Sequence, residues 1–313
     1  MKKLAMMGLG VAVGSMMLVT SVYAGVGDAP GYEAFKSAFK NSASIDNATR
    51  QIHVTMQDNG VELLDVNTTI KYDREQSAAS AKINVSDGTE QQELEFYNQD
   101  GQQIVKTGDS DVYKILDHEQ GRGPFKHSSD DGAIGKHEPN PEVVKEVENV
   151  VDALVGNLKN YVTMNDAAGG GKDIHFELTG SQIPPVVNAI GSLMIKHHND
   201  ALAGGRALPP SESSNPWGMN PAMLKDRLPK LSEDVKMDTV EMNATVDADN
   251  HITNQSAQIH ISGVDEAGVN HNVVVSMDMT LSGISSTQPD QVDLDGKQVE
   301  HVKVGERRFG NKE

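Results

Sequence analysis

Histidine and carboxylate side chains have the clearest capacity for chemistry in this sequence, and their spacing limits what they can do. His197 and His198 are adjacent, with Asp200 close behind. At 3.6 residues per turn, neighbours on a helix point about 100° apart, so one helix cannot direct both imidazoles at one ion. Together with Lys196 they are better suited to the negative C-terminal end of a helix. Since no set of ligands has metal-binding spacing, we predict no metal site.

Two other segments resemble ion-binding loops. Asp293-Leu294-Asp295-Gly296 has the letters of a calcium loop, but its first ligand position would be Gln291 and its twelfth Val302, where a glutamate is required. The calcium interpretation therefore fails at both ends. Another segment carries three histidines that could bind a soft ion weakly, although we favour a solvated loop: His118, His127 and His137.

Motifs of known enzyme classes are missing from the sequence. There is no nucleophile elbow, no zincin helix and no phosphate-binding glycine loop. Gly169-Gly170-Gly171 lacks the following Lys-Ser/Thr and precedes a predicted strand, which favours a flexible joint. The chain has no cysteine, so thiolate nucleophiles, disulfides and cysteine–zinc sites are excluded. We predict no catalytic residue and no cofactor, and we rank a hydrolase with an unfamiliar site last among the functions.

The chain is strongly acidic, with 45 Asp and Glu against 27 Lys and Arg and a formal net charge of −18. A field of this sign repels phosphate backbones and anionic lipid headgroups. We therefore expect no nucleic-acid partner and at most peripheral contact with a membrane. Solubility outside the cell is the simplest reason for the charge.

The N-terminus has the three parts of a bacterial secretory signal. Met1-Lys2-Lys3 is basic, Leu4–Val19 is apolar, and Val22-Tyr23-Ala24 ends in the small residues of a cleavage site. We predict a signal peptide over 1–24, cleavage between Ala24 and Gly25, and a secreted or envelope-associated protein. An uncleaved anchor is the alternative, although Gly and Ser residues interrupt the apolar run. A lipid anchor is excluded because it requires a cysteine.

The elements that would position any site begin with a helix over 31–44 and a hairpin. Tyr32, Phe35, Ala38 and Phe39 are spaced for one helix face. From Thr49 to Tyr72 the apolar period is two residues, broken at Asp58-Asn59-Gly60, where Asn-Gly is a strong hairpin signal. Since Val61 and Leu63 are out of phase with the rest of the return strand, we predict a bulge near Leu63-Leu64.

Further alternating segments predict strands over 79–86, 90–97, 102–107, 112–116 and 174–179, and three longer ones near 240–246, 257–261 and 273–281. Each has one apolar and one polar face, which is typical of an antiparallel sheet covered on one side. Helical spacing predicts two more helices, from Pro141 to about Tyr161 and from Ser181 to His198. Gly- and Ser-rich insertions near 118–140 and 199–217 are predicted to be mobile, and 286–313 to be a polar, loosely attached tail.

This order of elements resembles the LolA/LppX-like superfamily of bacterial envelope proteins. The resemblance rests on Tyr32–Phe39 leading into the hairpin Thr49–Tyr72, on Phe96–Gly101, and on the terminal segment Val240–Leu281. It implies an unclosed, strongly curved sheet, a half-barrel over 25–285, whose concave apolar side is plugged by helices. In the lipoprotein carriers of that group the concavity takes acyl chains, whereas other members are sensors or have no known ligand.

We therefore predict an α+β fold: a strongly curved antiparallel sheet with three helices packed on its concave face. The predicted function is non-enzymatic, holding a lipid, a lipoprotein acyl chain or another envelope protein against the sheet. The alternative is a structural or regulatory envelope protein whose core is filled by its own side chains. Methionine is a soft residue that suits a variable apolar ligand or an ordinary core. The candidate ligand-binding residues are Val54, Met56, Ile70, Phe96, Met242, Ile259, Met277 and Met279.

Overall fold

The computed structural model describes residues 29–108, 110–118, 158–185 and 229–304. The predicted signal peptide over 1–24 and the predicted mobile insertions, apart from His118 at a strand end, lie outside these residues. In the described part of the chain, no helix is both long enough and apolar enough to span a membrane.

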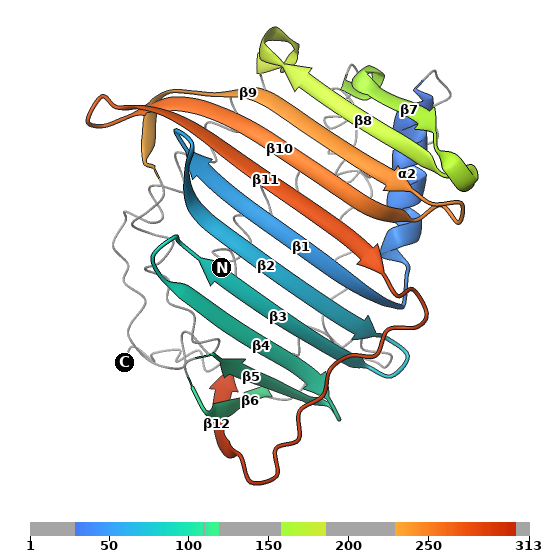
Figure 1. Ribbon diagram of the computed structural model, residues 1–313, viewed down its shortest axis with the longest axis vertical. Helices are drawn as coiled ribbons and strands as arrows, with labels where there is room; N and C mark the ends of the chain where they lie inside the picture. The colour runs from blue at the N-terminus through green and yellow to red at the C-terminus, as the bar shows by residue number, and fades with distance from the viewer. Residues whose placement is uncertain (1–28, 109, 119–157, 186–228, 305–313) are drawn as a thin grey trace, which may run out of the picture.

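A single sheet of twelve strands forms the body of the protein (Figure 1). The strand order is β12-β6-β5-β4-β3-β2-β1-β11-β10-β9-β8-β7. Neighbouring strands are antiparallel except β12, which pairs parallel with β6. The strands are β1 (Asn47–Asp58), β2 (Val61–Asp73), β3 (Ala78–Ser86), β4 (Gln91–Gln99), β5 (Gln102–Thr107), β6 (Val112–His118), β7 (Val162–Asp166), β8 (Lys172–Thr179), β9 (Leu231–Val246), β10 (Ile252–Asp265), β11 (Asn270–Ser282) and β12 (Gln298–Val304).

The hairpin of β1 and β2 forms as its sequence predicts. Asn59 and Gly60 both have positive φ, 51° and 81°, as a two-residue hairpin turn requires. The pairing changes register between Met56, opposite Leu64, and Gln57, opposite Glu62, so Leu63 is the extra residue. This confirms the predicted bulge.

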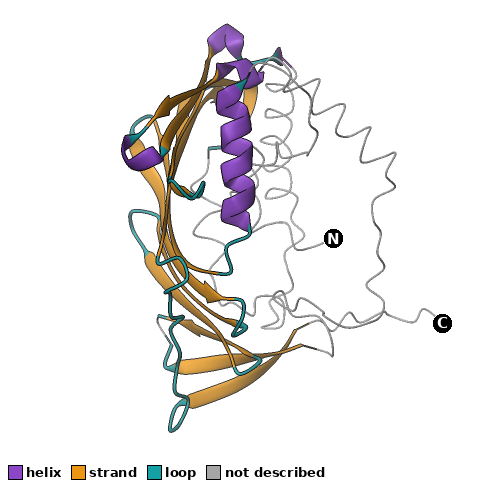
Figure 2. Ribbon diagram, turned by 90° about the vertical axis from the view of Figure 1, so that its right-hand side faces the viewer, coloured by secondary structure: helices purple, strands orange, loops and turns teal. Residues whose placement is uncertain are grey.

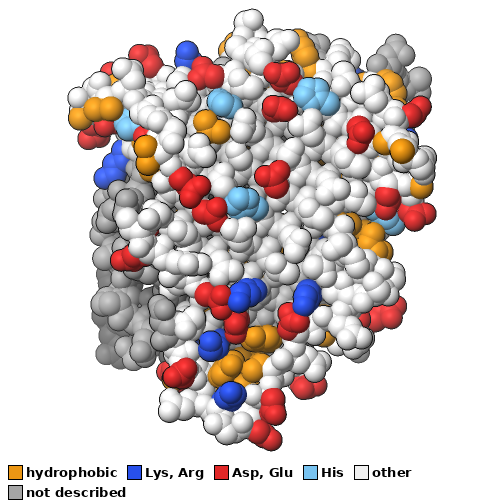
Figure 3. Space-filling view, in the orientation of Figure 1, with side chains coloured by type: hydrophobic (Ala, Val, Ile, Leu, Met, Phe, Trp, Pro, Cys, Tyr) orange, Lys and Arg blue, Asp and Glu red, His pale blue; other side chains and the backbone are white. Residues whose placement is uncertain are grey.

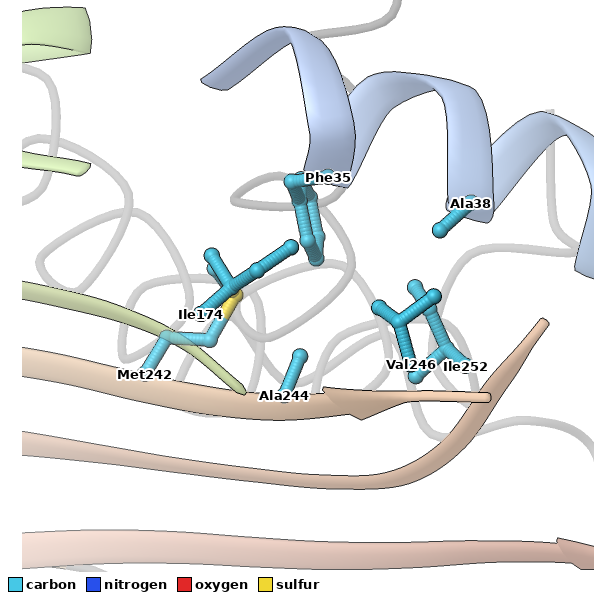
Figure 4. Close-up of a cluster of buried hydrophobic side chains, with 7 residues drawn as sticks. All are labelled: Phe35, Ala38, Ile174, Met242, Ala244, Val246 and Ile252. Atoms are coloured by element: carbon cyan, nitrogen blue, oxygen red, sulfur yellow. The ribbon is translucent and has the colours of Figure 1, made fainter. Parts of the chain in front are cut away.

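Helix α2 (Pro30–Ala43) lies on the concave side of the curved sheet (Figure 2). Pro30 starts the helix at a position where its missing donor costs nothing. Phe35 and Ala38 point from the helix into a buried cluster over the strands β8, β9 and β10 (Figure 4). Burial of this apolar surface fixes the helix to one end of the sheet. The strand residues of the cluster are Ile174, Met242, Ala244, Val246 and Ile252.

The prediction of three helices on the concave face is wrong for the described chain, in which α2 is the one α-helix. Leu158–Tyr161, where the second helix was expected to end, is a 3₁₀ turn that leads into β7. At the expected start of the third helix, Gly180–Gln182 is a 3₁₀ turn and Ile183 is extended. Most of both predicted segments lies outside the described residues. At these ends the chain forms 3₁₀ turns because the segments are short connectors that lead into β7 and out of β8.

Residues 286–304 of the predicted tail are also not loosely attached. Residues 283–297, here called the strap, cross the convex face of β1–β4 before β12 begins (Figure 1). Asn47 donates to the Thr287 carbonyl at 2.9 Å and accepts from its amide at 2.8 Å. Further along, the Gln99 side chain makes the same reciprocal pair with the Val292 backbone, both at 2.8 Å. These bonds replace the solvation that a polar segment would otherwise keep, and β12 then adds a strand to the sheet.

Candidate ligand-binding face

The two faces of the sheet differ in character, as the alternation of residue types predicted. Side chains on the concave side are mainly aliphatic. The convex side is polar, with acidic and histidine side chains scattered over it (Figure 3). A row of paired residues crosses its strands: Asn67, His53, Asp278, Ser256, Asn243 and His175.

All eight candidate residues lie on the concave face. Residues directly opposite one another in a sheet share a face. Val54 is opposite Met277, Met277 is opposite Ala257, and Ala257 is opposite Met242. Strand registers and two-residue steps along each strand place the others on the same side: Met56, Ile70, Phe96, Ile259 and Met279.

Burial divides these eight residues into two groups. Met242 and Met277 are 8% and 7% exposed, and Phe96 and Ile259 are buried as well. Each of these four packs in a different local cluster, so they do not converge on one cavity. The partly exposed residues are Val54, Met56, Ile70 and Met279.

Partly exposed aliphatic side chains are concentrated on the three central strands. We call this surface the apolar strip. Sequence reasoning selected three of its members and missed the rest, although the same alternation marks them, because alternation gives the face but not the degree of burial. The strip consists of Ile52, Val54, Met56, Val66, Ile70, Ala81, Ile83 and Val85.

One end of the apolar strip is basic and aromatic. Arg50 precedes Ile52 in the inward row of β1, and its guanidinium lies 5.4 Å from the centre of the Tyr72 ring. Its Nη2 donates to the Ser42 carbonyl of α2 at 3.1 Å. Sequence reasoning missed both residues. The available signal was a single arginine in the inward phase of an otherwise apolar row.

The other end of the strip is closed by an imidazole between two carboxylates, here called the clasp. His271 Nδ1 is 2.6 Å from Asp58 Oδ2, and its Nε2 is 3.4 Å from Asp265 Oδ2. Burial disfavours the imidazolium, but hydrogen bonds and charge from Asp58 and Asp265 outweigh it and raise the pKa of His271. The pKa of Asp265 is lowered, mainly because its carboxylate accepts a hydrogen bond from the backbone N–H of Val269. Desolvation raises this pKa, whereas the hydrogen bond and charge of His271 lower it further.

Hollows on the convex face are polar and do not suit an acyl chain. One has a volume of about 330 Å³ and lies over β7–β11. Its groups largely bond one another: His175 Nδ1 is 2.7 Å from Asn243 Oδ1, and Thr245 donates to Asp173 at 3.1 Å. Of the surfaces that the described residues form, the concave face therefore suits an apolar ligand better than this hollow does.

One group of side chains in the described chain could offer three ligands to a cation. Asp247, Asp249 and His251 lie in the turn between β9 and β10, with candidate atoms within 4.8 Å of one another. Asp247 already accepts the His251 amide at 2.8 Å and approaches its ring at 3.5 Å. These contacts are those of a tight turn, and we assign no metal to it.

Comparison with protein-family models and with curated protein sequences finds no match. Several solved structures are similar over most of the chain. A DUF1329 family protein from Desulfovibrio piger has 8% identity and a TM-score of 0.22, covering 84% of this chain and 94% of that one. A LolA superfamily protein from Nitrosomonas europaea has 8% identity and a TM-score of 0.22, covering 85% and 96%. The superfamily that the sequence resembles is thus among them, but similarity at this level assigns no ligand and no activity to this chain.

Proposed function

We propose that this protein holds an acyl chain or a similar apolar ligand on the concave face of its half-open sheet, in the bacterial envelope and without catalysis. The observation that carries the proposal is the apolar strip. Eight aliphatic side chains on three adjacent strands share one face and remain partly exposed. Contiguous apolar surface of this kind usually marks a binding site in a soluble protein. The signal peptide expected over 1–24 supports a location outside the cytoplasm.

Lipid extraction of the purified protein, followed by mass spectrometry, tests this proposal. We expect a co-purifying lipid in an amount comparable to the protein. Val54→Glu places a charge on the strip and should abolish it. Thr55→Glu, at the next residue and on the opposite face, is the matched control and should retain the lipid. Protein without lipid, from cells and after incubation with laurate, would contradict the proposal.

A structural or regulatory protein with a self-filled core is the second candidate. It is favoured by the burial of Met242, Met277, Phe96 and Ile259 among their own neighbours. In this case the concave face needs no ligand, and its role is to present the polar convex face to another envelope protein. A lipid-free, fully stable protein in the extraction experiment would support this candidate.

A further inference from the structure

A positive charge stands at one end of the apolar strip. In the inward rows of β1, β2 and β3, strands that the structure describes in full, Arg50 is the one basic side chain. The chain as a whole carries a net charge of −18, so the general field opposes an anion. A guanidinium keeps its charge at any physiological pH. Arg50 therefore provides local attraction for an anion against an unfavourable background.

Among the described residues, the contacts of Arg50 leave most of its N–H donors unused. Nη2 donates to the Ser42 carbonyl at 3.1 Å, an interaction that suits the negative end of α2. Arg50 forms no ion pair with a residue in the described part of the chain. A guanidinium has five N–H donors in a planar fork that fits carboxylate and phosphate oxygens. The hydrogen bond to the C-terminal end of α2 therefore uses only part of the donor capacity of the guanidinium.

Tyr72 adds a second, independent feature at the same place. Its hydroxyl is buried and lacks a hydrogen-bond partner among the described residues. Its ring is flanked by Arg50 and also by Arg74, whose guanidinium lies 5.7 Å from the ring centre and 3.3 Å from Asp46. A buried hydroxyl without a partner costs free energy that an acceptor oxygen would recover. This end of the strip thus offers hydrogen-bond donors from two side chains, Arg50 and Tyr72.

The opposite end of the strip determines the orientation in which a long ligand would bind. From Arg50 to Met56 the inward row of β1 spans six residue-to-residue steps, about 20 Å at the usual rise per residue. Beyond Met56 lies the clasp, where Asp58 and Asp265 place two carboxylates around one imidazole. An anionic group is repelled there and attracted at Arg50. A long-chain amphiphile would therefore bind in one orientation.

We infer that the ligand of the apolar strip is an anionic amphiphile. Its carboxylate or phosphate headgroup binds Arg50 beside Tyr72, and its acyl tail runs along β1 towards Met56. This inference rests on the proposed function and narrows it from apolar ligands in general to a charged class.

Calorimetric titration of the mature protein with laurate, dodecyl phosphate and dodecanol tests the inference. The three probes share one alkyl chain and differ in the headgroup. We expect both anions to bind about tenfold more tightly than dodecanol, as one charge-assisted hydrogen bond allows. The tighter of the two anions identifies the headgroup as a carboxylate or a phosphate.

Variants separate the charge of Arg50 from its contribution to folding. Arg50→Gln should weaken laurate binding about tenfold and leave dodecanol binding within about twofold, and Arg50→Lys should restore part of the loss. Lys82→Gln, a charge loss on the convex face, should change neither. Equal binding of laurate and dodecanol by the wild type would overturn the inference while the proposed function stands. Failure of all three probes to bind would overturn both, and the wild-type comparison holds even if Arg50→Gln does not fold.

Discussion

At the scale of single residues, the inward methionines are part of the packing. Met242 lies under α2, within 3.4 Å of the Gln255 amide through its sulfur, and Met277 packs against Val54 and its neighbours. The clasp residues are likewise fixed by neighbours on three strands. Met242, Met277 and the clasp stabilise the part of the sheet from β1 to β9, next to the apolar strip, which itself stays partly open.

Replacing either Met242 or Met277 by alanine should lower the free energy of unfolding by about 2–5 kcal/mol. The reason is that a buried side chain leaves a void that the surrounding sheet cannot close. Urea denaturation measures the loss, and Thr280→Ala on the exposed convex face should change stability by less than about 0.5 kcal/mol. A loss below about 1.5 kcal/mol, together with altered laurate affinity, would mean that the methionines line open ligand space instead.

His271→Gln should alter how stability depends on pH. Because the folded-state pKa of His271 lies above its ordinary value of 6.5, the clasp stabilises the protein fully below that pH. Its contribution is lost as the pH rises through the raised pKa. The stability difference between wild type and variant should therefore shrink as the pH rises above 6.5 and passes through the raised pKa.

Urea midpoints measured across that pH range provide the check. His301→Gln is the surface control, since its side chain is 61% exposed. A difference between wild type and His271→Gln that stays constant or grows with pH would contradict the protonated clasp.

At the scale of elements, close contact between α2 and β7 fixes how the helix enters the sheet. Gly31 in the first turn is buried, and a Cβ there would lie 2.6 Å from the carbonyl oxygen of Val162. Gly31→Ala in an unpacked helix would stabilise by about 1 kcal/mol. Here we expect destabilisation of at least about 1 kcal/mol, because backbone must move to accept the methyl group.

Thermal unfolding checks the sign of this effect. Asn41→Ala, on an exposed position of the same helix, should be neutral or slightly stabilising. A Gly31→Ala protein that is more stable than the wild type would show that the helix does not rest against Val162.

Elements with strong alternation could be predicted from the sequence, and weakly patterned ones could not. The strand over 79–86 and the bulge at Leu63 were predicted because their apolar residues fix the phase. The start of β9 at Leu231 was missed because Glu233 and Asp234 interrupt the apolar alternation. The strand β12 was missed because Val302 is the one residue in its described part that is buried. The face of every candidate site residue was predictable from phase. Which of them stay partly exposed depends on α2 and on cluster packing, and phase does not encode that.

At the scale of the whole molecule, the strap and β12 attach the C-terminal segment to the sheet. The strap lies on the convex face of β1–β4, and β12 pairs with β6 at the edge. Lys71 Nζ lies 2.7 Å from Asp290 Oδ1 over the convex face, and Val302 of β12 packs with Leu94, Phe96, Val105 and Leu116. Truncation after Ser282 should therefore lower the urea midpoint and promote oligomers, because cluster residues and the β6 edge lose their cover.

Size-exclusion chromatography and urea denaturation of the truncated chain measure both effects. Lys71→Gln serves as the milder comparison, since an exposed ion pair contributes about 0–1 kcal/mol. A truncated protein that stays monomeric with an unchanged midpoint would show that the segment is dispensable.

The parallel pairing of β12 with β6 also has a consequence for the order of assembly. Residues 112–118 are synthesised well before residues 298–304, so the partner of β6 is among the last segments to emerge. In the interval, the outer edge of β6 carries backbone donors and acceptors on which a strand from another nascent chain could add. Pairing across such a sequence separation is slow. The final step of folding is thus a competition between the pairing of β12 with β6 within one molecule and strand pairing between molecules, and its outcome depends on the local concentration of newly made chains.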